Sequence, residues 1–244
     1  MKSKIRWFGA FLALILSLVI GFSFTSNQTE AAKKEAPLKI GMEANYPPYN
    51  WTQTTDANGA VPIDGSKQYA NGYDVQIAKI IGKKLHRKVV VEKTEWDGLL
   101  PALTSGKIDL IIAGMSPTAE RRKAINFSEP YRKGTFVITN KDGKFAQAKG
   151  LNDFKGAKLT AQQGTLHYDL IKQLHGAKRE PAMRSFSAMR QSLQSGTIDG
   201  YVAEDIEYQS YKTVNPNIVA VNLNKMQGFH IPYEDSITSI GVKK

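Results

Sequence analysis

The chain of 244 residues contains no cysteine, which excludes disulfide bonds, thiol nucleophiles and cysteine-ligated metal sites. Histidine is scarce as well: there are four, and none stands at a metal-ligand spacing from a second histidine or an acid. A Gly-x-Ser-x-Gly elbow and a phosphate-binding loop are also missing. These absences argue against the common hydrolases, metalloenzymes and nucleotide-binding enzymes, and we expect neither a metal nor a cofactor.

Acidic residues are in the minority, because 33 Lys and Arg against 22 Asp and Glu give a formal net charge of +11. Such an excess can favour nucleic acid, an anionic membrane or an acidic cell envelope. A nucleic-acid interface needs basic residues gathered on one element. Here they are scattered, and the densest run beyond the N-terminus covers only residues 83–88. We therefore interpret the charge as a solvated basic surface and expect no nucleic-acid partner.

One long apolar run, at residues 7–24, sets the start of the chain apart. Basic residues precede it, and a polar stretch with small residues, 25–32, follows it. This layout predicts a secretory signal peptide over residues 1–32, cleaved near Ala31 or Ala32. The run also approaches the roughly 20 apolar residues that span a bilayer, so an uncleaved anchor is the alternative. We expect an exported chain, in the periplasm or at the outer face of the cell membrane.

Beyond residue 37, short apolar runs alternate with segments of helical periodicity. Strands are predicted at residues 38–42, 89–91, 108–113, 136–139, 158–162, 198–203 and 218–222. Helices are predicted at residues 74–85, 96–103, 165–174, 187–194 and 205–211, the first capped by Asp74. A loop is expected over 45–49 and an exposed polar excursion over 52–71. Strand–helix alternation of this kind is typical of α/β folds with parallel sheets covered on both faces.

The sequence repeats one short pattern. Residues 103–109 and 193–199 read Leu-Thr-Ser-Gly-Lys-Ile-Asp and Leu-Gln-Ser-Gly-Thr-Ile-Asp. In each copy the Ser-Gly pair stops a helix, and Ile-Asp leads into an apolar strand. We therefore predict two similar lobes, over residues 38–134 and 135–234, with a strand over 235–244 returning to the first.

Polar side chains follow the strand at 108–113, where parallel sheets place their ligand clefts. Ser116 or Thr118 can cap the next helix, whose N–H groups favour an anion. Arg121 lies in the first turn of that helix, where a cation gains nothing from the helix dipole. A bidentate hydrogen-bonded pair with a ligand carboxylate explains its position. The alternative is a surface arginine paired with Glu120 or Glu129.

The second lobe offers a matching set of groups. Thr165 follows a Gln-Gly turn and can donate its hydroxyl and N–H to the same carboxylate. We expect Asp205 to cap the helix after residue 203, which leaves Glu204 free to accept hydrogen bonds from an ammonium group. His167 is close to the Thr165 turn, and a surface or capping role is the preferred interpretation. Together with Arg121, these groups match the two charges of an α-amino acid.

The chain resembles bacterial extracellular solute-binding family 3, the polar-amino-acid-binding branch of ABC-transporter solute-binding proteins. The resemblance covers nearly the whole chain from about residue 38. Its most specific part is the run of residues 113–121 and 127–131. Matching segments are also found at residues 40–49, 72–75, 95–103, 106–109, 163–165 and 198–204.

The resemblance implies a two-lobed, periplasmic-binding-protein-like fold of type II, with mostly parallel sheets, flanking helices and two hinge strands that allow closure. Arg121 would hold the α-carboxylate, and Glu204 stands where the family usually has an Asp for the α-ammonium. Glu43 stands where some members have an acid that meets a cationic side chain, such as that of Arg, Lys, ornithine or His. The implied ligand-binding residues are Glu43, Tyr46, Trp96, Ala113, Gly114, Ser116, Arg121, Gln163, Thr165 and Glu204.

The resemblance further implies a monomeric, non-enzymatic protein that delivers a free amino acid to the membrane permease of an ABC transporter. Family members usually continue with a C-terminal helix on the first lobe. Since the sequence ends directly after the predicted return strand, that helix is expected to be missing here. Two alternatives stay open: a small-acid-processing enzyme on the same fold, and a membrane-anchored ligand-sensing ectodomain.

Overall fold

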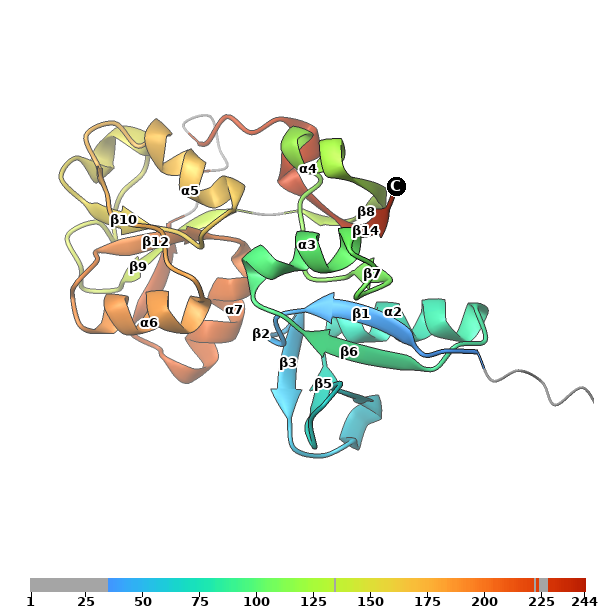
Figure 1. Ribbon diagram of the computed structural model, residues 1–244. Helices are drawn as coiled ribbons and strands as arrows, with labels where there is room; N and C mark the ends of the chain where they lie inside the picture. The colour runs from blue at the N-terminus through green and yellow to red at the C-terminus, as the bar shows by residue number, and fades with distance from the viewer. Residues whose placement is uncertain (1–34, 134, 222, 224–227) are drawn as a thin grey trace, which may run out of the picture. The chain divides into compact units, whose positions relative to one another are not determined.

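The computed structural model describes residues 35–133, 135–221, 223 and 228–244 (Figure 1). The predicted signal peptide or anchor, residues 1–32, lies outside these residues. Ala36–Lys244 forms one compact unit. Within the described part of the chain, no helix combines the length and the apolar character that crossing a membrane would require.

The first sheet has the strand order β6-β1-β7-β14-β8. Its strands are β1 (Leu38–Met42), β6 (Val89–Lys93), β7 (Leu110–Ile111), β8 (Ile125–Lys133) and β14 (Ile237–Lys243). Strands β6, β1 and β7 are parallel, whereas β14 runs antiparallel to both β7 and β8. The helical elements of this half are α2 (Tyr73–Lys84), η2 (Trp96–Gly98), α3 (Leu99–Thr104), α4 (Ala119–Ala124) and η5 (Tyr233–Ser236).

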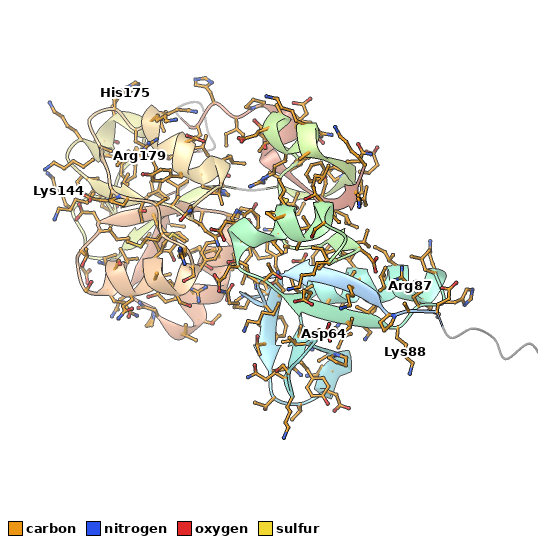
Figure 2. The ribbon with its side chains drawn as sticks, viewed as in Figure 1. Asp64, Arg87, Lys88, Lys144, His175 and Arg179 are labelled. Carbon is orange, nitrogen blue, oxygen red and sulfur yellow. The ribbon has the colours of Figure 1, made fainter. Side chains whose placement is uncertain are left out.

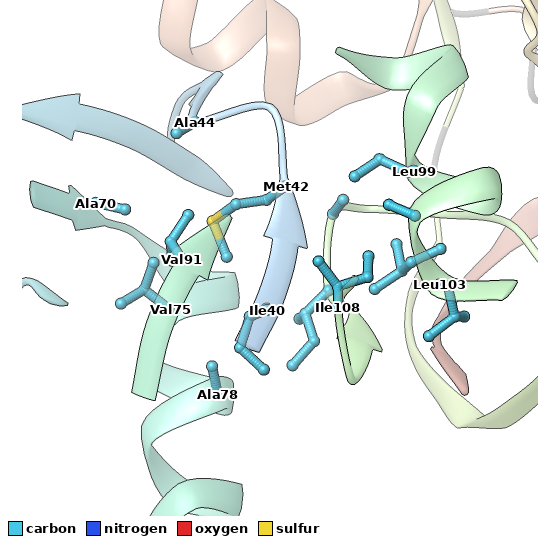
Figure 3. Packing of buried hydrophobic residues seen from close by; sticks show 14 of the residues in the cluster. Ile40, Met42, Ala44, Ala70, Val75, Ala78, Val91, Leu99, Leu103 and Ile108 are labelled. Atoms are coloured by element: carbon cyan, nitrogen blue, oxygen red, sulfur yellow. The ribbon is translucent and has the colours of Figure 1, made fainter. Parts of the chain in front are cut away.

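The core of this half lies between the sheet and its helices. Ile40 and Met42 of β1 are fully buried, as are Val75 of α2 and Leu99 and Leu103 of α3. Figure 3 shows these side chains packed around β1. Burying a side chain of this size contributes about 1.5–3 kcal/mol, so this cluster stabilises the platform from which the loops after β1 and β7 extend.

The second sheet has the order β11-β10-β12-β9-β13. Its strands are β9 (Phe136–Asn140), β10 (Lys158–Thr160), β11 (Lys178–Arg179), β12 (Gly200–Ala203) and β13 (Ile218–Val221). Strands β11, β10 and β12 are parallel, and β9 is antiparallel to its neighbours β12 and β13. The accompanying helices are η3 (Leu151–Phe154), α5 (Leu166–Leu170), η4 (Ile171–Gln173), α6 (Phe186–Gln194) and α7 (Asp205–Val214).

The repeated sequence pattern has the same structure in both halves. The Asp109 carboxylate accepts a hydrogen bond from the backbone N–H of Lys39 at 2.9 Å, at the start of β1. The Asp199 carboxylate accepts from the N–H of Lys158 at 2.8 Å, at the start of β10. Both glycines of the pattern have positive φ, 79° at Gly106 and 72° at residue 196, as a helix stop requires. The two halves are therefore built alike at this point.

A third, small sheet corrects the sequence prediction for residues 45–71. Strands β2 (Asn45–Tyr46), β3 (Asn50–Gln53), β5 (Tyr69–Asn71) and β4 (Val61–Pro62) pair in that order, with η1 (Ala57–Gly59) between β3 and β4. The segment is largely exposed, as expected, but it is not irregular. The strands have two to four residues, too few to show an alternating pattern.

Two further predictions need correction. Gly72, not Asp74, is the N-cap of α2, and its φ of 128° explains the glycine. Strand β8 was not predicted, because its sequence, Ile-Asn-Phe-Ser-Glu-Pro-Tyr-Arg-Lys, carries a proline and a largely exposed edge. The predicted strand at 108–113 forms ladder pairs at Leu110 and Ile111 alone.

The charged surface agrees with the scattered charge of the sequence. Figure 2 shows Arg87 and Lys88 beside the first sheet, and Lys144 and Arg179 beside the second. Arg87 pairs with Asp109 at 2.8 Å, so part of this charge is locally compensated. Ion pairs at such exposure contribute little to stability, about 0–1 kcal/mol, and their main effect is on solubility.

Candidate ligand-binding site

A cavity of about 30 Å³ lies where the loops after β1 and β7 face the second sheet. Every predicted site residue except Gln163 lines it: Glu43, Tyr46, Trp96, Ala113, Gly114, Ser116, Arg121, Thr165 and Glu204. Four residues outside the predicted set also line it: Gln162, Leu166, His167 and Phe186. Both halves of the molecule therefore contribute polar groups to one small cavity.

Arg121 is 8% exposed and lies in the first turn of α4, where Thr118 is the N-cap and accepts from its backbone N–H. Its guanidinium donates to the carbonyl oxygens of Ser116 and Gly164, both at 2.8 Å. It also lies 5.1 Å from the ring of Trp96, a cation–π geometry. The alternative of a surface arginine paired with Glu120 or Glu129 is wrong.

The Arg121 side chain is a buried cation without a buried counter-ion. Among the described residues, no carboxylate lies within ion-pair distance of it. Burial lowers the pKa of Arg121 to about 10, which leaves the group charged at neutral pH. A buried charge that only carbonyl groups compensate is costly, and an anion placed against it would be strongly stabilised.

Glu204 supplies an acidic group from the second half. It is 5% exposed at the N-cap position of α7, and its carboxylate accepts a hydrogen bond from the Tyr49 hydroxyl at 3.0 Å. Burial raises its pKa to about 8 against the opposing effects of Tyr49 and Arg132. The expected cap, Asp205, instead lies within the first turn and accepts from Arg132 at 2.5 Å. The Glu204 side chain makes no capping hydrogen bond to α7, although Glu204 and not Asp205 occupies the N-cap position.

Glu43 follows β1 and is 5% exposed. Its carboxylate accepts from the Gln162 side-chain amide at 2.8 Å, and burial raises its pKa to about 7. Gln162 takes the place predicted for Gln163, because successive side chains along an extended segment point to opposite faces. Gln162 faces the cavity, whereas Gln163 is exposed.

Aromatic rings close the cavity in a way the sequence did not indicate. Tyr46 stacks on Phe186, with ring centroids 4.4 Å apart and planes within 4°. Phe186 opens α6 after the N-cap Ser185, and this start of a helix, with a serine cap, is the signal in the sequence that points to it. Trp96 contacts the second half through its indole N–H, which donates to Gly164 at 3.3 Å.

His167 lines the cavity and neither caps α5 nor projects as a surface residue, which corrects its predicted role. The N-cap of α5 is Thr165. Burial and the nearby positive charge of Arg121 lower the pKa of His167 to about 4, so the ring is neutral at physiological pH. A neutral imidazole can both donate and accept a hydrogen bond beside the guanidinium.

A buried carboxyl group holds the loop after β7 in place. The Gly114 N–H donates to the Tyr131 hydroxyl at 3.0 Å, and this hydroxyl donates to Asp74 at 3.1 Å. Asn50 donates to the other Asp74 oxygen at 2.7 Å. Gly114 has a φ of 64°, which favours glycine, and a Cβ there would approach the Tyr46 ring at 3.4 Å. Asp74 therefore organises the site rather than capping a helix.

Hydrogen bonds between these same groups connect the two halves. Arg121 and Trp96 both donate to Gly164, Glu43 accepts from Gln162, and Glu204 accepts from Tyr49. The remaining 30 Å³ exceeds the roughly 10–15 Å³ that a water molecule requires but is far below the ~300 Å³ typical of small ligand sites. A ligand the size of an amino acid fits only if these contacts separate.

Residues 38–165, more than half of the chain, match the family model of bacterial extracellular solute-binding proteins, family 3. The chain belongs to this family. This solute-binding protein is 30% identical to the probable histidine-binding protein of Campylobacter jejuni, over 86% of this chain and 77% of that protein. It is 29% identical to the arginine-binding extracellular protein ArtP of Bacillus subtilis, over 91% and 80% of the two chains.

Solved structures agree with the fold. An ancestral arginine-binding protein bound to arginine superposes on this solute-binding protein with a TM-score of 0.69 and 33% identity, covering 86% of each chain. The predicted two-lobed α/β fold of type II is confirmed by this likeness and by the two mixed sheets. The two named relatives are called a histidine-binding and an arginine-binding protein.

Proposed function

We propose that this solute-binding protein captures a free amino acid with a cationic side chain between its two lobes. The observation that carries the proposal is that a buried guanidinium without an ion-pair partner, Arg121, and a buried acid, Glu204, line the same cavity. An α-amino acid presents the complementary charges at the distance of two covalent bonds. Its carboxylate would take the hydrogen bonds that Arg121 now donates to carbonyl groups, helped by Ser116 and Thr165.

The second buried acid of the cavity favours one class of side chain. Glu43 lies in the same cavity, and among the residues that the structure describes its carboxylate accepts one side-chain hydrogen bond, from Gln162. A cationic group there would stabilise the charged form of Glu43 against the desolvation that raises its pKa. A neutral side chain would leave that desolvation uncompensated. The names of the relatives, which bind histidine and arginine, favour the same class.

Delivery follows from closure. A ligand that bridges both lobes binds the closed form more tightly than the open one and so shifts the population toward it. We propose that the closed form, as an exported monomer, docks on the membrane permease of an ABC transporter. Gln163 is exposed and does not line the cavity. It stays a predicted ligand contact, and it could touch the ligand only after a movement of the lobes.

Isothermal titration of the mature chain with Arg, Lys, ornithine, His, Gln, Glu and cystine tests the proposal. One-to-one binding with preference for a cationic member is expected. Replacing Arg121 by Ala is expected to weaken binding by roughly 3 kcal/mol, or about a hundredfold in Kd, since the ligand carboxylate loses its charged partner.

Arg122→Ala is the matched control. Arg122 is adjacent in α4, exposed, and donates to Pro117 away from the cavity. It is expected to bind as wild type does. Wild-type affinity in a folded Arg121→Ala variant would refute the carboxylate assignment. A preference for Gln or another uncharged member would retain the binding function and remove the role given to Glu43.

A further inference from the structure

A second, larger cavity adjoins the first. This groove has a volume of about 650 Å³ and shares Trp96, Arg121, Thr165 and Leu166 with the small cavity. Arg121 and Trp96 therefore line both spaces. The groove lies within the 300–1,000 Å³ range of small-molecule sites, whereas the inner cavity does not.

The groove combines an apolar lining with acidic groups. Leu100, Met115 and Ile231 contribute apolar surface, and Asp97, Glu120, Asp169 and Asp235 are its acids. Asp169 is compensated by Lys172 at 2.6 Å and Arg179 at 4.0 Å. In the described part of the chain, the other three acids have no cation within ion-pair distance.

This arrangement contrasts with the chain as a whole, whose net charge is +11. The field of the three uncompensated acids reaches the inner site. Glu120 and Asp235 oppose the lowering of the Arg121 pKa, and Asp97 contributes to raising the pKa of Glu43. A basic protein that gathers uncompensated carboxylates around one groove attracts cations there and disfavours anions.

We propose that the groove is an outer site that receives a cationic amino acid and passes it to the inner cavity. This inference rests on the proposed function and adds the route by which the solute arrives. The ammonium or guanidinium head of the solute would lie among Asp97, Glu120 and Asp235, with its aliphatic stem on the apolar lining. Separation of Trp96 and Arg121 from Gly164 would then join the two spaces.

The chemistry of the groove predicts a kinetic role. Asp97 and Glu120 are exposed and Asp235 is partly so, hence their attraction is screened by salt and contributes little to final affinity. Charges placed around a concave approach raise the association rate constant more than they lower the dissociation rate constant. Neutralising them should therefore slow arrival and leave residence time nearly unchanged.

Stopped-flow tryptophan fluorescence with arginine as the probe tests this on the full mature chain. The variant D97N/E120Q/D235N is compared with D56N/E129Q/D142N, a control with the same charge change at exposed positions outside both cavities. At low ionic strength the groove variant is expected to associate about tenfold more slowly, with dissociation changed less than twofold. The difference should nearly vanish at about 1 M salt. D97N/E120Q, which changes exposed residues alone, should give an intermediate rate.

Three outcomes would overturn the inference. An unchanged association rate would show that the groove does not attract the solute. An equal slowing in the control would assign the effect to net charge. A slowing that persists at high salt would point to altered shape. Each would leave the proposed function intact, because affinity would remain, whereas a wild-type chain that binds no cationic amino acid would refute both.

Discussion

We predict that Glu43 makes the proposed binding of arginine dependent on pH. Its pKa is raised to about 7 by burial, so the free protein carries a mixture of the acid and the carboxylate near neutral pH. A cationic side chain binds the carboxylate alone and lowers its pKa in the complex. Affinity should therefore be greatest above about pH 7 and should fall as the pH decreases.

The magnitude follows from linkage. Suppose that the complex keeps Glu43 ionised down to about pH 5. At that pH, about two units below the pKa of Glu43 in the free protein, binding must release one proton from the group. That costs about 2.7 kcal/mol, or roughly a hundredfold in Kd relative to a pH well above 7. Glu204, with a pKa of about 8, adds a second proton in the same direction.

Titration calorimetry with arginine from about pH 5 to 8, in buffers of different ionisation enthalpy, measures both the affinity and the protons released. Glu43→Gln keeps the shape and removes one titrating group. It should bind arginine more weakly at high pH and release one proton fewer, while the contribution of Glu204 remains. The same proton release in wild type and variant would refute the assignment of a cationic side chain to Glu43.

Two further predictions concern stability. Burial raises the pKa of Asp74 to about 7. Between about pH 4 and 7 the native state therefore holds a proton that the unfolded chain has already released. Stability should fall as the pH rises through this range and level off above it. Asp74→Asn should flatten that dependence in thermal unfolding, and an unchanged profile would contradict it. Gly82→Ala gains about 1 kcal/mol of helix propensity, but its Cβ would lie 2.8 Å from the Arg87 carbonyl oxygen and 2.6 Å from Val89. Overpacking costs about 1–3 kcal/mol, so the melting temperature should decrease, and an increase would show that the end of α2 can relax.

The sequence predicts an element correctly where that element depends on local signals, such as hydrophobic periodicity or a helix-stop residue. The strand Leu38–Met42, the α-helical segment before Ser195 and the polar residues after each strand were predicted because periodicity and stop signals are local. Gln162 was missed because the strand was expected to extend through it. The sequence did not determine whether the side chain of Gln162 or that of Gln163 faces the cavity. Asp205 was assigned to capping because its charge suits a helix start, while its pairing with Arg132 depends on a strand that sequence reasoning did not find.

Long-range pairing explains the remaining differences. The role of Asp74 depends on Tyr131 and Asn50, which come from other strands and cannot be associated with it by spacing. Phe186, at the start of α6, stacks on Tyr46 of β2, a residue far from it in the sequence. Nine of the ten predicted site residues line one cavity, because a resemblance to a family supplies such long-range pairings in advance; that they contact a ligand stays a prediction.

The paired Ile-Asp segments have a consequence for sheet register. In each half the aspartate carboxylate accepts a hydrogen bond from the backbone N–H one residue before the parallel ladder begins. In the first half this is Lys39, since β1 and β7 first pair at Ile40 and Leu110. In the second half it is Lys158, directly before the first β10–β12 pair. A slip by one residue would break that bond and turn the buried isoleucine, Ile108 or Ile198, away from the core. The aspartate therefore fixes which residue comes last before each cavity-lining loop. Because the two halves fix their strands independently, a slip in one would misalign half of the site and leave the other half correctly set.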